Sequence, residues 1–255
     1  MVATRDGYEN WQSASFVVPF AFDSTGVIDS SGSGVDWNNV TLRLTYNGAD
    51  ASTTFTDLSN DGHTVTANGD AQVSGNQLLL DGSGDYLSIP DASGLELGGD
   101  DFGIEDFVTF NSLPTSGNSM AFCGKWGSSN GTRSYIIGIY NNGGTYQFKF
   151  AYTTDGTTGV DENNDLPVTP STGVKYHYAV TRDGSDIRFF WDGALVATLT
   201  LGSSIADVSE GFTIGAINSG AWDNLDGKLD DFRFVKGEAP YTAAFTAPTP
   251  PLPTS

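Results

Sequence analysis

The sequence is poor in cysteine, histidine and basic residues, and each shortage removes a class of function. Its 255 residues include one cysteine and two histidines. Cys123 cannot form a disulfide within the chain, so the fold does not require an oxidising compartment. Apolar neighbours such as Phe122 favour a buried thiol over a reactive one. His63 and His177 are too few for a histidine-based metal centre, and no nucleophile-elbow motif accompanies them.

Basic residues are scarce relative to acidic ones. The chain has 11 lysines and arginines against 31 aspartates and glutamates, which gives a formal net charge of -20. Such a surface repels phosphate backbones, and this excludes a nucleic-acid partner. The excess of acid keeps a protein soluble, but it also supplies the hard oxygen ligands that Ca²⁺ prefers. The composition alone leaves both explanations open.

Long hydrophobic runs are also missing. The longest run near the start is residues 16–22, which Pro19 interrupts, and none approaches the length of a membrane span. The first residues lack a basic region followed by an apolar one, so we expect no Sec-type signal peptide. These features predict a soluble protein that is assembled in a cytoplasm and does not insert into a membrane.

Turn-forming and strand-forming residues are abundant. The 32 glycines and 12% aromatic residues accompany only 16% charged residues, a composition typical of short strands joined by tight turns. Asp192-Gly193 lies between an aromatic strand and the apolar strand that begins at Leu195, residues 141–144 separate two aromatic strands, and both predict hairpins. No window shows helical periodicity. The expected strands are residues 41–46, 77–80, 85–89, 104–110, 119–126, 134–140, 145–152, 176–182, 186–191, 195–201, 212–217 and 228–235. They predict an all-β, two-sheet antiparallel jelly-roll sandwich.

Strand signals begin at Val40 and divide the chain into three segments. Residues 1–39 carry an apolar patch and a Gly/Ser-rich linker, which predicts an N-terminal arm that docks on other subunits. The patch residues expected at that interface are Phe16, Phe20 and Phe22. Residues 40–247 are expected to form the jelly-roll domain. Residues 248–255 are rich in proline and are expected to form an extended tail.

Several motifs between residues 40 and 253 occur together in one known family. They are Leu42-Arg43-Leu44-Thr45-Tyr46-Asn47-Gly48, Leu80-Asp81-Gly82-Ser83-Gly84-Asp85-Tyr86-Leu87, Trp191-Asp192-Gly193 and Gly227-Lys228-Leu229-Asp230-Asp231-Phe232-Arg233-Phe234. In this order and spacing they resemble the laminin-G-like, concanavalin A-like lectin/glucanase jelly rolls of the type found in bacteriophage structural proteins. Two features depart from that family: Asp106 stands where relatives carry an apolar or small residue, and residues 1–39 have no counterpart.

The resemblance implies a structural Ca²⁺ shared by an early acidic loop and the last strand. The loop would supply the side chains of Asp57 and Asn60 and the carbonyl of His63, and the last strand would supply Asp230 or Asp231. Ca²⁺ takes roughly six to eight such oxygens in flexible geometry. The alternative is a solvated turn in which the Asp and Asn side chains cap their own backbone.

Carboxylates suited to glycoside hydrolysis are not evident. Hydrolysis needs two opposed carboxylates about 5–10 Å apart, whereas the adjacent Glu105 and Asp106 point to opposite faces of a strand. Residues 161–165 imitate an EF-hand loop, but Leu166 replaces its glycine. We therefore expect a protein that is not an enzyme, and keep a glycan-processing activity only as an unfavoured alternative.

Aromatic side chains beside polar ones are candidates for stacking on a sugar. Trp222 is the best of them, because it lies within the polar run of residues 218–224. Trp126 and Tyr152 are further candidates for a ligand-binding surface.

Taken with the resemblance, these features predict a non-enzymatic virion structural protein, either a head decoration or a tail or fibre component, that displays a lectin-like domain. Its expected partners are other virion proteins and further copies of itself, and the virion is its expected location. The main alternative is a carbohydrate- or receptor-binding adhesin module whose partner is a host-surface glycan.

Overall fold

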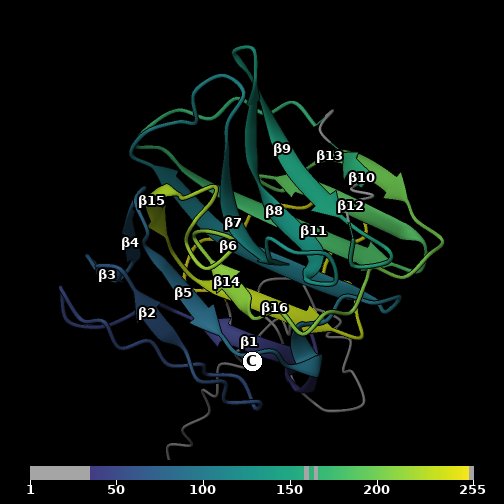
Figure 1. The fold of residues 1–255 in the computed structure, drawn as a ribbon, viewed down its shortest axis with the longest axis horizontal. Helices are drawn as coiled ribbons and strands as arrows, with labels where there is room; N and C mark the ends of the chain where they lie inside the picture. Colours follow the sequence, from purple (N-terminus) through teal and green to yellow (C-terminus); the bar gives the residue numbers. More distant parts are fainter. Residues whose placement is uncertain (1–34, 158–160, 164–165, 253–255) are drawn as a thin grey trace, which may run out of the picture.

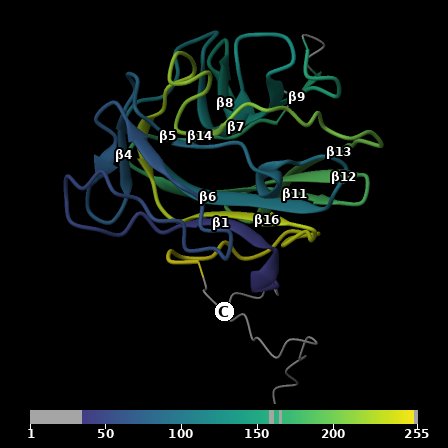
Figure 2. The same ribbon diagram turned by 60° about the horizontal axis from the view of Figure 1, so that its bottom comes forward.

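The structure, a computed structural model, describes residues 35–157, 161–163 and 166–252. In this part of the chain, two antiparallel β-sheets pack face to face. Figure 1 looks onto the smaller sheet, and Figure 2 shows the two sheets as layers. The predicted two-sheet jelly-roll sandwich is confirmed.

Sheet A contains nine strands among the described residues. Its main order is β13, β12, β11, β6, β15, β4, β3, while β16 pairs with both β6 and β1. The bounds are β1 (Val40–Leu44), β3 (Gln72–Val73), β4 (Leu78–Asp81), β6 (Phe102–Phe110), β11 (Lys175–Asp183), β12 (Asp186–Trp191), β13 (Ala194–Thr200), β15 (Asp226–Leu229) and β16 (Phe232–Lys236).

Sheet B contains seven strands within the same ranges, in the order β10, β9, β8, β7, β14, β5, β2. Asp192 and Gly193 join β12 to β13 with φ angles of 49° and 74°, the left-handed backbone that an Asp-Gly hairpin predicts. The bounds in sheet B are β2 (Thr66–Asn68), β5 (Tyr86–Ile89), β7 (Ser119–Trp126), β8 (Arg133–Asn142), β9 (Thr145–Tyr152), β10 (Asp161–Asn163) and β14 (Phe212–Ile214).

Helix is confined to two short 3-10 turns in the described residues, η1 (Trp37–Asn39) and η2 (Ser93–Leu95). No helix there combines the length and the apolar character that a membrane crossing requires.

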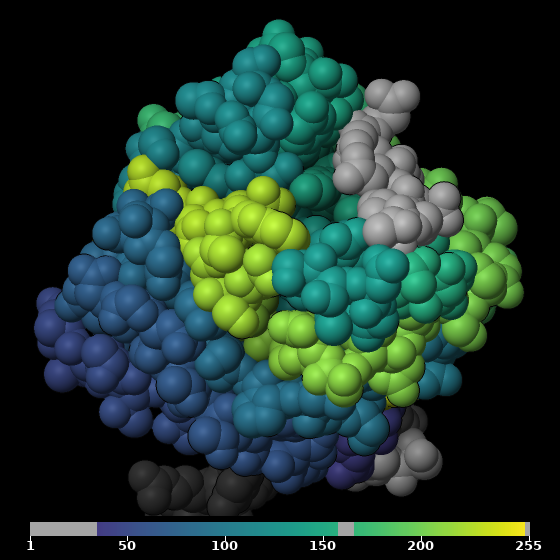
Figure 3. All heavy atoms as spheres, viewed as in Figure 1, coloured from purple at the N-terminus to yellow at the C-terminus, as the bar shows by residue number. Residues whose placement is uncertain are grey.

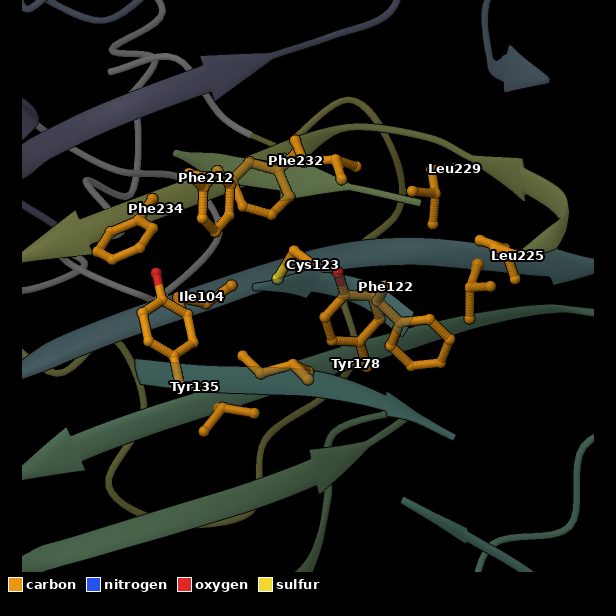
Figure 4. Close-up of a cluster of buried hydrophobic side chains, with 14 of the residues drawn as sticks. Ile104, Phe122, Cys123, Tyr135, Tyr178, Phe212, Leu225, Leu229, Phe232 and Phe234 are labelled. Carbon is orange, nitrogen blue, oxygen red and sulfur yellow. The ribbon is translucent and has the colours of Figure 1, made fainter. Parts of the chain in front are cut away.

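Alternation along each strand divides its side chains between the core and the outer face of the sheet. Phe122 of β7 and Tyr178 of β11 meet in the core with their ring centroids 4.6 Å apart. Figure 4 shows these rings together with Cys123, whose thiol is completely buried, as its apolar neighbours predict.

Asp106 places a carboxyl group inside this core. Its Oδ2 accepts a hydrogen bond from the Tyr46 hydroxyl at 3.2 Å. Its Oδ1 accepts from the backbone N–H groups of Phe107 and Asp230, at 2.6 and 3.1 Å. Complete burial raises the pKa of Asp106 well above its ordinary value. Because the Asp230 amide is held by β6, the single strand expected at 228–235 is broken here into β15 and β16.

The outer face of sheet A carries a second group of buried charges around Glu105 of β6. Glu105 lies 3.0 Å from Nε2 of His177. It also accepts hydrogen bonds from Arg233 Nε at 2.7 Å and from the Tyr241 hydroxyl at 3.0 Å. Burial alone would raise the pKa of Glu105, but Arg233 and His177 outweigh burial and lower the pKa to about 2. Glu105 and Asp106 therefore point to opposite faces, as their adjacency predicts.

Residues 239–252, which we call the closing segment, cover this outer face. Pro240 packs on Gly103, where an added Cβ would lie 2.3 Å from the proline ring. The rings of Tyr241 and Phe245 stack at 3.6 Å, and both contact Phe190 of β12. Figure 2 shows the segment in yellow below β1 and β16, on the side away from sheet B.

A buried ion pair fixes the far end of the closing segment. Arg43 of β1 pairs with Asp231, and these side chains are 0% and 1% exposed. Arg43 also donates to the Leu252 carbonyl at 2.9 Å, and the Leu252 amide donates to Asp231. The first strand of the described chain, the junction of β15 with β16 and the closing segment are thus held at one point.

Residues 35–39, which we expected in the arm, contact the domain. Val35 and Trp37 pack on Val40 and on Val235 of β16. The boundary at residue 39 stays a prediction. The predicted assembly residues Phe16, Phe20 and Phe22 lie outside the described residues.

Replacing Arg43 by alanine is expected to lower the free energy of unfolding by about 3–5 kcal/mol, because the Asp231 carboxylate would stay buried without its partner. Urea denaturation followed by tryptophan fluorescence measures the change. Arg188→Ala is the control: its ion pairs with Asp183 and Asp186 are partly exposed, so their loss should cost about 0–1 kcal/mol. Equal losses in the two variants would contradict the structural role given to Arg43.

Candidate ligand-binding face

Residues 217–224, which we call the Trp222 loop, connect β14 to β15 across the outer face of sheet B. Among the described tryptophans only Trp222 is exposed, with 42% of its surface accessible. The loop closes on itself through paired backbone hydrogen bonds between Ile217 and Trp222, at 3.1 and 3.3 Å. Figure 3 shows this region as a yellow-green patch on the surface of that face. Trp222 thus lies exposed in this loop, and its role in binding a ligand stays a prediction.

Backbone hydrogen bonds fix the Trp222 loop on β7. Asn218 donates to the Trp126 carbonyl at 2.9 Å, and the Asp223 carbonyl accepts from Ala121 at 2.7 Å. Asn218, Ser219 and Asp223 have φ angles of 52°, 52° and 53°. This left-handed backbone is uncommon outside glycine, and such conformations gather at functional sites. These hydrogen bonds and backbone conformations therefore fix the position of the loop that carries the exposed ring.

Asp223, the loop residue that follows Trp222, belongs to a polar group with side chains of β7 and β9. Nζ of Lys149, on β9, lies 3.2 Å from the Asp223 carboxylate and 3.0 Å from the Ser119 hydroxyl. The exposed ring of Trp222 offers a stacking surface, and the group at the next residue offers an ammonium, a carboxylate and a hydroxyl for directional hydrogen bonds. This combination suits a ligand that has apolar C–H faces and many hydroxyls.

The other two aromatic candidates are not exposed. Trp126 is 7% exposed, since it packs against Ile217 and under the Arg133 guanidinium, 5.7 Å from the ring centroid. Tyr152 is 5% exposed and stacks on Phe150 at 5.5 Å. The expectation of an open ring face is wrong at both positions, because strand alternation turns Tyr152 inward and Ile217 lies against Trp126.

Asp57 organises its own loop. Its carboxylate accepts hydrogen bonds from the backbone amides of Arg43, Ser59 and His63 and from the Ser59 hydroxyl, all within 2.8–3.0 Å. It also lies 2.9 Å from Nδ1 of His63. Burial would raise the pKa of Asp57, but these hydrogen bonds outweigh burial and lower it. The contacts agree with the capped-turn alternative, and the Asn60 side chain is exposed beside them.

Both carboxylates of the late pair are already engaged with basic side chains. Asp231 is paired with Arg43, and Asp230 is paired with Lys175. The Asp57 carboxylate contacts the His63 ring. Among the described residues, however, the acids of the early loop and those of the last strand do not form one cluster of carboxylate oxygens. A metal role for these five residues stays a prediction.

Asp70, Asp81 and Asp85 form an acidic group that the sequence analysis did not identify as a site. Their carboxylate oxygens lie within 4.8 Å of one another, so the group could hold a metal ion. Asp85 already accepts hydrogen bonds from the amides of Asp70 and Asp81, at 2.8 and 3.1 Å. Burial raises the pKa of Asp85, and the Asp81 charge adds to the increase. The Asp81-Gly82-Ser83-Gly84-Asp85 motif was the available signal, since its glycines fold both acids back together.

A buried lysine holds another acidic group at the end of β7. Lys125 is completely buried, pairs with Glu96 and lies 2.6 Å from Asp91. Burial raises the pKa of Glu96 to about 7, and Asp207 adds to the increase while Lys125 opposes it. Glu96 therefore titrates near neutral pH.

The comparison with known families identifies the chain's class. Residues 81–239 match a laminin-G family model described as the concanavalin A-like lectin/glucanases superfamily. The match covers more than half of the chain, so the chain belongs to this superfamily, and the suspected resemblance is confirmed. No curated protein matches the chain.

Solved structures with this fold include several binding domains. The binding domain of Paraclostridial Mosquitocidal Protein 1 superposes with a TM-score of 0.60 at 11% identity, over 80% of this chain and 50% of that one. The binding domain of botulinum neurotoxin serotype D/C gives 0.58 at 14% identity, over 80% and 50%. This chain thus spans about half the length of these two structures.

A third similar structure is domain 4 of AbnA, an extracellular GH43 arabinanase from Geobacillus stearothermophilus, in complex with arabinotriose. It superposes with a TM-score of 0.56 at 18% identity, over 82% of this chain and 98% of that domain. At such identities the likeness shows the fold alone.

Stability is expected to fall as the pH rises through neutrality because of Glu96. Its pKa in the folded protein, about 7, lies above the ordinary value of 4.5. The native state therefore binds this proton more tightly than the unfolded state, and the stabilisation is complete below the unfolded pKa and lost as the pH rises through 7. Urea denaturation between about pH 5 and 8 tests this. In Glu96→Gln the free energy of unfolding should depend less on pH, whereas the control Glu210→Gln should keep the dependence of the unaltered chain. An unchanged pH dependence in Glu96→Gln would show that Glu96 is not its cause.

Proposed function

We propose that this chain is a non-enzymatic binding domain that recognises a glycan on the outer face of sheet B. The observation that carries the proposal is Trp222: its ring is open to solvent in a loop bonded to β7, and the next residue, Asp223, is paired with Lys149. Membership of a lectin-like superfamily and the likeness to binding domains, one of them holding arabinotriose, support it. Glu105 and Asp106, the adjacent acids of β6, are engaged in buried hydrogen bonds on opposite faces, which supports a role without hydrolysis.

Replacing Trp222 by alanine is expected to abolish glycan binding while leaving the fold intact, because the exposed ring supplies the stacking surface and contributes little to the core. Binding of the full chain to a broad glycan array, followed by calorimetry with the best ligand, measures the effect. Leu195→Ala is the control, since Leu195 is 43% exposed at the edge of sheet A. Glycan binding that survives Trp222→Ala, or an array without a ligand, would count against the proposal.

A second candidate is the display of this domain on a virion, as a head decoration or a tail or fibre component beside other virion proteins and copies of itself. The supporting observation is the position of the described domain's two ends. Val35 packs on Val235, and Leu252 is bonded to Arg43. Both contacts lie on the outer side of sheet A, whereas Trp222 lies on the outer side of sheet B. A domain attached at its ends would thus present the Trp222 loop outward.

Electron microscopy of particles assembled with and without this protein tests the second candidate. Added density with the Trp222 loop facing away from the particle is the expected result. Particles that never incorporate the protein would exclude it.

Calcium is the ion that we propose for the acidic sites. Calorimetric titration of the full chain with calcium chloride, repeated with Asp81→Asn and with Asp57→Asn, separates the two predicted locations. Loss of binding in Asp81→Asn alone is expected if the Asp70, Asp81 and Asp85 group is the site, because its oxygens converge. Absence of heat in the unaltered chain would exclude calcium at both.

A further inference from the structure

A polar hollow of about 530 Å³ lies on the outer face of sheet A, opposite the Trp222 loop. Its floor includes Thr109 of β6 and Lys175 of β11, neighbours in register whose side chains point away from the core. The turn between β3 and β4 forms one wall. The end of the closing segment, with Pro250 and Pro251, forms another. The volume falls in the range of small-molecule sites, about 300–1,000 Å³.

Asp230 is the fixed charge of this hollow. Its backbone amide donates to Asp106 Oδ1 and to the Phe107 carbonyl, at 3.1 and 3.0 Å, so β6 sets its position. Its Oδ2 accepts from Lys175 and from Gln77, the latter at 3.3 Å. Its Oδ1 has no hydrogen-bond partner among the described residues. The Asp230 side chain is 15% exposed, so this oxygen is an oriented acceptor that the fold itself leaves unused.

Four further polar side chains line the hollow without a hydrogen bond to any described residue. They are Thr45, Asn47, Asn76 and Thr109. Together they offer two amides, each both donor and acceptor, and two hydroxyls.

The backbone around the hollow is held in uncommon conformations. Asn76 and Asp231, which line it, have φ angles of 59° and 92°, and Tyr46, between two lining residues, has 52°. A left-handed aromatic residue is costly, and such conformations persist where the surrounding structure imposes them. Of the eight non-glycine residues with positive φ in the described chain, three lie here and three lie in the Trp222 loop.

We infer that this hollow is a second binding site, and that it takes a neutral, polyhydroxylated ligand such as a di- or trisaccharide. Oδ1 of Asp230 and the unpaired amide and hydroxyl groups match the alternating donors and acceptors of sugar hydroxyls. An anionic ligand fits poorly, because Asp230 neutralises Lys175 and the chain carries a net charge of -20. A peptide strand fits poorly as well, because Pro250 and Pro251 have no N–H to pair with it. The site is independent of the Trp222 loop, on the opposite face of the sandwich.

Amide-resolved NMR titration of the full, ¹⁵N-labelled chain tests the inference. The probes are arabinotriose, maltotriose, cellotriose and N,N′-diacetylchitobiose. At least one is expected to shift the amide signals of Asn76, Gln77 and Lys175 saturably, and to do so equally in Trp222→Ala. Asn76→Gly, which keeps the left-handed backbone, and Lys175→Met should each weaken this binding roughly tenfold.

Asn142→Ala, at the exposed tip of the β8–β9 hairpin, is the matched control and should leave the affinity unchanged. The inference is overturned if no probe shifts these three signals, or if Asn76→Gly and Lys175→Met both bind as the unaltered chain does. Shifts that vanish in Trp222→Ala would also overturn it, since they would assign the effect to the other face.

Discussion

The ion pair between Arg43 and Asp231 is the contact on which the outer layer of this domain depends. Two charges removed from water are stable only when each keeps its partner and its remaining hydrogen bonds are made. Here the Phe232 and Leu252 carbonyls accept hydrogen bonds from Arg43, and the Leu252 amide donates one to Asp231. The closing segment is therefore a partial third layer of the sandwich, which buries the outer face of sheet A around Glu105 and Arg43. Asp106 lies beneath the same junction and fixes the amide of Asp230, so the core and the outer layer meet at the break between β15 and β16.

Local signals predicted most of the sheets. β7, β9 and β12 have the expected bounds, because each is a run of aromatic and β-branched residues between turn residues. β2 and β3 were missed, since residues 66–68 and 72–73 are short and mostly polar and form strands through pairing with β5 and β4. The break at Asp230 was missed for a different reason: its cause is a hydrogen bond to Asp106, which is distant in the sequence.

The sites were less predictable than the strands. Polar neighbours in the sequence made Trp222 the best candidate for an exposed ring, but they did not decide between exposure and core packing. They do not reveal that Ile217 folds back on Trp126, nor which way Tyr152 faces. Asp57 shows a chemical ambiguity as well, because the same oxygens that suit Ca²⁺ also accept backbone amides. The Lys125–Glu96 pair and the hollow at Asp230 are each formed by segments that are distant in the sequence, so no local motif predicts them.

The closing segment also determines where this domain ends. The matched family region stops at residue 239, and all the described strands lie before it. A chain cut there would keep both sheets, yet it would lose the Tyr241 hydroxyl from Glu105 and the Leu252 backbone from Arg43. The charged groups of Glu105 and Arg43 would then be exposed to water and would each lack one of their hydrogen-bond partners. The matched family region is thus shorter than the stretch of chain that supplies partners to these buried charges.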